Sequence, residues 1–403
     1  MTFSGHAPGS REYRRLIVGL FFAGIATFAQ LYSAQAVLPQ IASDLAVGPA
    51  TAAVSVSAAT LGLALAVIPW SIVADRIGRV PAMATGVLLA TLFGLAAPLS
   101  GEIAVLLLLR FAEGVALGAV PAVALAYLSE EVAARYAATA AGSYIAGTTV
   151  GGLLGRIVSG IVGEVGGWRV GILSVAVVCL AAAILFLSLT PRARGFVPGR
   201  LRVDRGPGIL ERLRGPLRSR VQWALYAQGF LLMGAFVAVY NYLGFHLSAP
   251  PFALPAWVVT LLFLAYLAGT VSSPWAGTLA SRVGRFPVLL ASIGVMAIGA
   301  VLLLVPLAAI VLLGLVLFTA GFFGAHAVAS GWTPVAAGAA SRAQASSLYY
   351  FAYYAGSSLF GWALGLVFGA ASWSWFVAVI LAMCAAAALA AVSALRGARS
   401  GLV

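Results

Sequence analysis

Charged residues are scarce in this chain: aspartate, glutamate, lysine and arginine together fill 8% of its 403 positions. In soluble domains about a quarter of all residues are charged, so this composition excludes a water-soluble globular protein. Hydrophobic residues make up 63% of the sequence, and the mean hydropathy is +1.07. Strand-type alternation is also missing, which argues against an outer-membrane barrel.

Cysteine is rare and lysine is absent. We expect Cys179 and Cys384, which both lie in apolar runs, to be reduced packing residues rather than a disulfide. The sequence has no phosphate-binding glycine loop, no metal-ligand spacing and no selectivity-filter loop, so we expect no enzyme, no cofactor and no metal site. All 23 basic residues are arginine, against 10 acidic residues, giving a net charge of +13. Because no basic patch lies on a polar, foldable segment, we expect no nucleic-acid partner.

The apolar residues form twelve long runs. At about 22 residues per spanning helix, twelve helices use roughly 65% of the chain, which matches the hydrophobic fraction. The first run is too long for a signal peptide and should remain as a helix. The sequence therefore predicts an all-α polytopic membrane protein with short loops. The runs lie near 16–38, 51–73, 81–99, 103–127, 136–161, 169–190, 221–246, 256–279, 286–305, 308–330, 344–369 and 374–395.

The arginines indicate the orientation of the helices. With both termini in the cytoplasm, 20 of the 23 arginines fall on the cytoplasmic side, Arg169 falls outside, and Arg110 and Arg156 fall within helices. Positive residues favour the cytoplasmic side, so this orientation is the expected one. The only long polar segment, 191–220, carries nine arginines and predicts a cytoplasmic linker, with a short amphipathic helix on anionic lipid headgroups.

Short strings repeat at about half the chain length. RIGRVP at 76–81 returns as RVGRFP at 282–287, and AGTTVGG at 146–152 returns as AGSSLFG at 355–361. Many secondary transporters are built from two such parallel halves. We therefore predict six-helix bundles at 1–190 and 221–403, joined by the linker 191–220.

The loop SIVADRIGR at 71–79 resembles the loop between helices 2 and 3 of the major facilitator superfamily. The matching residues are Asp75, Arg76, Gly78 and Arg79, while Ser71 and Val73 depart from the family pattern. An acid at a helix end can hold a facing helix N-terminus or an arginine in one conformation, which suits a gate. A turn that merely follows the positive-inside rule is the alternative.

The second copy of this loop keeps Arg282, Gly284 and Arg285 but has Ser281 where the first has Asp75. We therefore expect a charged latch in the first half only.

The string Arg110-Phe-Ala-Glu113-Gly resembles the family's R-x-x-Q/E-G motif. Three residues apart, Arg110 and Glu113 share a helix face and can pair. Glu113 lies about 15 Å along its helix, near the bilayer midplane, where ionisable groups are costly and usually functional. The pair predicts a proton-coupling site, with a purely structural ion pair as the alternative.

Gly147, Gly151 and Gly152, followed by Arg156, resemble the antiporter signature G-P-x-x-G-G of family exporters, although Thr148 replaces the proline. Close packing of small residues is the alternative explanation. The strings GFFGAHAVASGW at 321–332 and ASSLYYFAYYAGSSLFGW at 345–362 resemble the YnfM-like branch of twelve-helix proton-driven exporters.

Further polar and aromatic side chains inside the runs are candidates for a substrate cavity. The four tyrosines of the eleventh run could line a cavity or pack helices. His326 could titrate or serve as a hydrogen-bonded packing residue. The candidates are Gln30, Tyr32, Gln35, Tyr144, Gln228, His326, Tyr349, Tyr350, Tyr353 and Tyr354.

The resemblance implies a secondary active transporter of the major facilitator fold in a bacterial inner membrane, working by alternating access as a monomer. Its partners would be protons and a small organic molecule or drug that it exports. An importer or uniporter of an organic anion on the same fold is a rival, because the runs hold two central arginines against one glutamate. A non-transporting sensor or scaffold is a second rival.

Overall fold

The computed structural model describes all residues except 1–4, 197–208, 339–340 and 398–403. Within the described residues, eleven helical stretches are long and apolar enough to cross a membrane. One of them, Thr139–Leu189, has 51 residues, about twice the length that a bilayer core needs. Gly167 interrupts it with a φ of 78°, so this stretch supplies two spans. The predicted all-α architecture of twelve membrane-spanning helices is confirmed.

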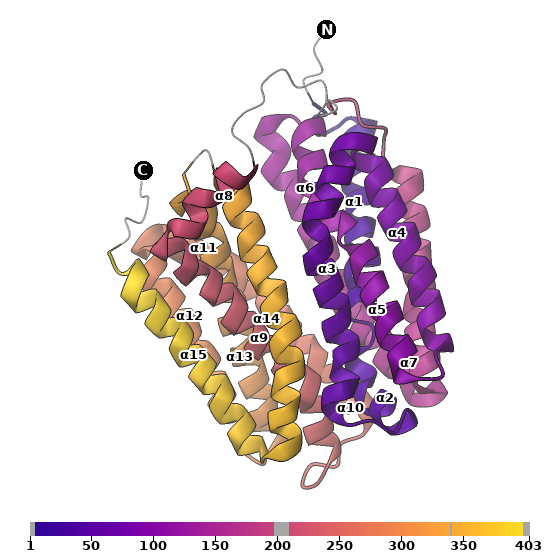
Figure 1. The fold of residues 1–403 in the computed structure, drawn as a ribbon, viewed down its shortest axis with the longest axis vertical. Coiled ribbons are helices and arrows are strands. Elements are labelled where there is room, and N and C mark those ends of the chain that lie inside the picture. Colours follow the sequence, from indigo (N-terminus) through magenta and orange to yellow (C-terminus); the bar gives the residue numbers. More distant parts are fainter. Residues whose placement is uncertain (1–4, 197–208, 339–340, 398–403) are drawn as a thin grey trace. The chain divides into compact units, whose positions relative to one another are not determined.

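The described chain divides into two compact units (Figure 1), and each is described by itself. Unit 1 comprises residues 1–47 and 58–204, so the first part of helix α3 belongs to unit 2. The elements from α1 to α7 are α1 (Arg11–Leu31), η1 (Gln35–Val37), α2 (Leu38–Asp44), α3 (Pro49–Ile77), α4 (Arg79–Ala96), η2 (Ala97–Leu99), α5 (Ile103–Leu117), α6 (Ala119–Glu131), η3 (Ala134–Tyr136) and α7 (Ala137–Leu189).

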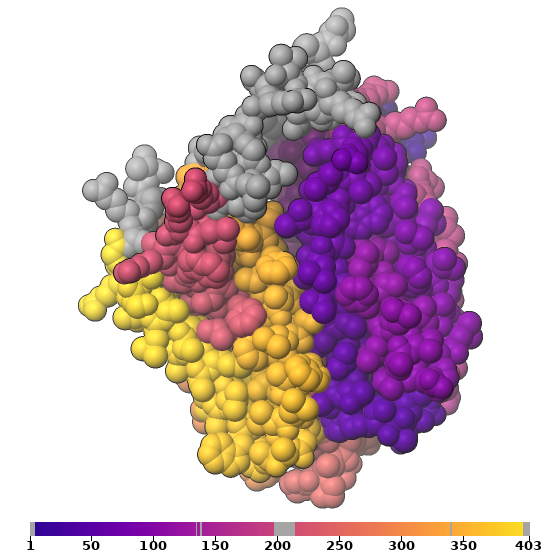
Figure 2. All heavy atoms as spheres, in the orientation of Figure 1, coloured from indigo at the N-terminus to yellow at the C-terminus, as the bar shows by residue number. Residues whose placement is uncertain are grey.

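Unit 2 comprises residues 48–57 and 205–403. The side chains of its last two helices, α14 and α15, pack side by side along this unit (Figure 2). Its elements from α8 onward are α8 (Ile209–Arg218), α9 (Arg220–Ser248), α10 (Ala256–Leu261), η5 (Leu262–Tyr266), α11 (Leu267–Val283), α12 (Arg285–Leu302), α13 (Ala308–Ala336), α14 (Arg342–Ala370) and α15 (Trp373–Leu395).

One glycine in each unit makes an equivalent sharp turn between two long helices. Gly78 separates α3 from α4 with a φ of 102°, and Gly284 separates α11 from α12 with a φ of 97°. Residues with a Cβ rarely adopt this left-handed region, so the glycine of each repeated string is what allows the turn. The turn places the arginine that follows it, Arg79 or Arg285, at the start of the next helix.

Both cysteines are buried and free, as the sequence predicts. Cys179 packs among Ala29, Val175 and Val158 inside unit 1. The buried core of each unit consists largely of alanine, leucine, valine and aromatic side chains.

Candidate functional site

Arg110 and Glu113 form an ion pair on α5, and both side chains are fully buried. Arg110 also binds the end of α1, where Nη2 donates to the carbonyl of Leu31 at 2.6 Å and Nη1 to that of Gln30 at 3.1 Å. The last carbonyls of a helix lack helical partners and carry partial negative charge, so a buried cation satisfies them well. The arginine thus links the carboxylate of Glu113 to the backbone of α1.

Gln30 and Gly94 complete the surroundings of this pair. The Gln30 amide donates from Nε2 to the carbonyl of Ala90 on α4 at 3.0 Å. A Cβ at Gly94 would lie 1.5 Å from that Nε2 and 3.0 Å from Glu113 Oε1. A side chain at position 94 would therefore require the Gln30 amide to move from its present place. Gly94 is not among the residues predicted from the sequence, where its only signal is a glycine inside an apolar run.

Arg156 lies in a second buried polar cluster of unit 1, with 1% of its surface exposed. Its guanidinium lies over the ring of Tyr32, with Cζ 4.0 Å from the ring centroid. Nε donates to Gln35 Oε1 at 2.6 Å, and Nη1 donates to the carbonyl of Gly152. The structure therefore brings two of the cavity candidates, Tyr32 and Gln35, to the end of the antiporter-like string at Arg156.

The other glycines of this string face α1 instead. A Cβ at Gly147 would lie 2.2 Å from the carbonyl oxygen of Phe21, and a Cβ at Gly151 would lie 2.7 Å from Cα of Ile25. Such distances mean that the two backbones touch, which is the small-residue packing named as the alternative for this motif. Tyr144 is buried in the apolar core of the same unit.

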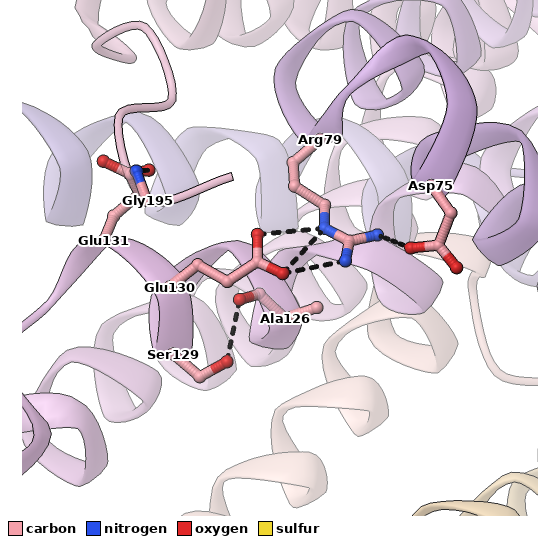
Figure 3. Close-up of polar contacts among 7 residues, drawn as sticks. All are labelled: Asp75, Arg79, Ala126, Ser129, Glu130, Glu131 and Gly195. Atoms are coloured by element: carbon pink, nitrogen blue, oxygen red, sulfur yellow. Dashed lines mark hydrogen bonds and ion pairs between the residues drawn. The ribbon is translucent and has the colours of Figure 1, made fainter. Parts of the chain in front are cut away.

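Arg79 is the centre of an ion network at the loop formed by residues 71–79 (Figure 3). Its guanidinium donates to Asp75 Oδ1 at 2.7 Å, and to Glu130 Oε2 at 3.1 Å and Oε1 at 2.8 Å. Arg79 is buried, whereas Asp75 is half-exposed. The arginine that Asp75 holds is thus the one four residues later. Its second partner, Glu130 on α6, is not among the residues that the sequence predicted for this loop. Arg76 of the same loop is exposed.

The second copy of the loop has no such network among the residues that the structure describes. The hydroxyl of Ser281 donates to the carbonyl of Thr278 in its own helix at 2.7 Å. Nη1 of Arg285 is buried and has no hydrogen-bond partner in the described part of the chain, and Arg282 is exposed. The charged contacts around the loop are confined to the first copy.

The aromatic candidates of unit 2 separate into different surroundings. His326 Nδ1 lies 2.9 Å from the hydroxyl of Tyr349, and the His326 ring lies 4.8 Å from that of Tyr353. Tyr350 is 42% exposed, whereas Tyr354 is buried. The rings of the four tyrosines contact one another along α14, but their exposure differs.

Gln228 lies in a different place, where its amide donates to the carbonyls of Ala224 at 3.1 Å and Ala387 at 2.9 Å. The bond to Ala387 joins α9 to α15, whereas the bond to Ala224 lies within α9, so Gln228 contributes to packing within unit 2.

Comparison with known proteins is decisive for the family. The model of the Major Facilitator Superfamily matches residues 20–361. The chain belongs to the major facilitator superfamily. It is 39% identical over 360 residues to the inner membrane transport protein YnfM of Escherichia coli, covering 89% of this chain and 85% of that protein. It is 36% identical over 376 residues to the MFS-type transporter YybF of Bacillus subtilis, covering 93% and 92%.

Solved structures of the superfamily share its fold. A mutant of the nucleoside transporter NupG aligns with a TM-score of 0.74 at 15% identity, covering 94% of this chain and 100% of that one. The xylose transporter XylE of E. coli aligns with a TM-score of 0.74 at 14% identity, covering 97% and 99%. The protein is a multi-pass membrane transporter with the major facilitator fold.

Proposed function

We propose that this transporter is proton-coupled and exports a small organic molecule by alternating access, and that it has no enzymatic activity. The observation that carries the proposal is the fully buried pair of Arg110 and Glu113 on α5, inside the membrane-capable stretch Ile103–Glu131. Ionisable groups inside a membrane are costly, and they usually mark ion or substrate pathways. This is also the argument against a scaffold that has kept the fold without transport.

The pair can couple protons to substrate through competition for one arginine. Burial opposes ionisation of Glu113, and the guanidinium of Arg110 favours it. When Arg110 turns toward a substrate, Oε2 of Glu113 loses its partner and accepts a proton. When Arg110 returns, that proton leaves. Substrate binding and protonation of Glu113 are therefore linked through Arg110.

Location and direction complete the proposal. The arginine distribution supports a cytoplasmic position for both termini in a bacterial inner membrane, with anionic lipids at that face. Export is supported by the antiporter-like string with Gly147 and Gly151, whose close contact with α1 suits helices that shift against each other.

Uptake of an organic anion is the second candidate, and Arg156 is the observation that favours it. This second buried arginine gives the membrane-spanning part of unit 1 two central arginines, Arg110 and Arg156, against the single carboxylate of Glu113. A site with excess positive charge attracts a negative substrate.

Proteoliposomes containing a pH-sensitive dye test the coupling. The substrate is first found by comparing metabolites inside and outside cells with and without the protein. We expect Glu113→Gln to abolish substrate-driven proton flux while keeping substrate exchange, because the amide mimics the protonated acid. The control is Glu102→Gln, which removes an exposed carboxylate just before α5 and should behave like the parent. Proton flux that persists in Glu113→Gln would disprove this role, and accumulation driven by an inward proton gradient would favour the anion importer.

A further inference from the structure

Residues 190–196, which follow α7, form a strap across the end of α6. The hydroxyl of Tyr127 donates to the carbonyl of Pro191 at 2.7 Å. Oε1 of Glu131, the last residue of α6, accepts the backbone N–H groups of Arg194 and Gly195 at 2.6 Å each. Figure 3 shows Glu131 beside Gly195. Glu131 is fully buried. Because one oxygen of this buried side chain holds two backbone N–H groups of the strap, Glu131 is its main anchor.

The strap lies directly on the backbone of α6. A Cβ at Gly195 would lie 2.1 Å from the carbonyl oxygen of Glu130. On the same helix end, the backbone N–H of His6 donates to the carbonyl of Glu131 at 2.7 Å, and the N–H of Ala133 donates to the carbonyl of His6 at 3.0 Å. His6 Nε2 lies 3.8 Å from Glu131 Oε2. The end of α6 is thus enclosed by chain segments that are distant in sequence.

The last residue of the strap covers the gating arginine. The guanidinium carbon of Arg79 lies 5.3 Å from the ring centroid of Phe196, within the range of a cation–π contact. A Cβ at Gly78 would lie 3.9 Å from the same ring. Arg79 is only 6% exposed, although its partner Asp75 is half-exposed. Phe196 therefore helps to keep water from an ion network that lies near the surface.

We propose that Glu131 is a positioning residue of the gate: it fixes the strap so that Phe196 holds Arg79 between Asp75 and Glu130. Glu131 does not itself bind Arg79, and it acts only through the strap. The proposal stands whether or not the transporter is proton-coupled, because it concerns only unit 1 and its gating loop.

The test is a double-mutant cycle on the purified full-length protein, measured as the midpoint of thermal unfolding. Arg79→Ala should lower the midpoint in the parent by several degrees, and in Glu131→Ala by at most half as much. Residues without shared contacts usually give additive effects, so the deficit reports coupling through the strap. Equal shifts in both backgrounds, or no shift from Arg79→Ala in the parent, would overturn the proposal.

Two further variants keep the test decisive even if Glu131→Ala folds poorly. Glu131→Gln keeps an oxygen that can accept both N–H groups, so the effect of Arg79→Ala should match that in the parent. Phe196→Ala keeps every anchor of the strap but removes the ring, and should reduce the effect of Arg79→Ala as Glu131→Ala does. A full effect of Arg79→Ala in Phe196→Ala would contradict the proposed path. Trypsin should cleave at Arg194 faster in Glu131→Ala, and an unchanged cleavage rate would show that Glu131 is not the anchor.

Discussion

Equivalent backbone carbonyl groups in the two units accept hydrogen bonds from different kinds of side chain. Gly152 on α7 and Gly361 on α14 are 209 residues apart in the repeated string. In unit 1 that carbonyl accepts from the guanidinium of Arg156, and in unit 2 it accepts from the hydroxyl of Tyr242 at 2.7 Å. Gly365, which is 209 residues after Arg156, leaves the room that the Tyr242 ring needs. A shared packing scheme thus carries a charge in one unit and a neutral phenol in the other.

The contrast extends to the helices that hold the buried pair. In unit 1, α1 and α5 meet around Arg110 and Glu113. In unit 2, α9 and α13 meet through the stacked rings of Phe236 and Phe322, 4.0 Å apart, and through a hydrogen bond of 2.7 Å between Tyr240 and Thr319. The sequence has no aspartate or glutamate after Glu211. Among the described residues, all ion pairs lie in unit 1, whereas unit 2 offers rings and hydroxyl groups.

The largest effect should come from breaking the charged interface. Arg110→Ala leaves the buried carboxylate of Glu113 unpaired and should cost about 3–5 kcal/mol of unfolding free energy. The matched change in unit 2, Tyr240→Phe, removes one neutral hydrogen bond and should cost about 1 kcal/mol. Unfolding in a denaturing detergent measures both. Equal costs would mean that the two interfaces do not differ energetically as their chemistry suggests.

A glycine comparison should give the next effect. Gly94→Ala forces a methyl group into the Gln30 amide and should destabilise the protein by about 1–3 kcal/mol. It should also weaken proton coupling, because Gln30 and Glu113 share that space. The control is Gly294→Ala on α12, where a Cβ meets open space, and it should cause no loss. If Gly94→Ala keeps stability and coupling, the close fit around Glu113 is not needed.

The two gating loops should differ by a smaller amount. Asp75→Ala removes a half-exposed partner of Arg79, worth roughly 1 kcal/mol at most, and should change the ratio of conformations by up to about fivefold. Ser281→Ala should be nearly silent, since its hydroxyl bonds only within its own helix. Reactivity of cysteines introduced beside the loops reports the ratio, because both native cysteines are buried. Equal effects would indicate that the loops act through backbone shape rather than charge.

The smallest effect is expected at the histidine of unit 2. His326→Phe keeps a ring beside Tyr353 and loses only the contact with Tyr349. Substrate-driven proton flux in proteoliposomes should therefore stay close to the parent value, in contrast to Glu113→Gln. Loss of proton flux in His326→Phe would move the coupling group into unit 2 and end the division of roles between the units.

Local features of the fold and of the site could be predicted from the sequence. The twelve helices follow from apolar runs of membrane length, because a helix satisfies its own backbone hydrogen bonds and needs no distant partner in lipid. The contact between Arg110 and Glu113 follows from a spacing of three residues on one helix. The turns at Gly78 and Gly284 follow from the repeated string and from the freedom of glycine at positive φ.

Contacts between distant segments were decided only by the tertiary structure. Glu130 is 51 residues from Arg79, and Gly94 lies against Gln30 across two helices. No local periodicity encodes such pairs. The sequence alone also does not show that Gly147 and Gly151 contact α1, whereas Gly152 lies beside Arg156. In a chain whose helices are apolar on nearly every face, the sequence determines that a segment spans the membrane, but which side a residue presents depends on the helix packed against it.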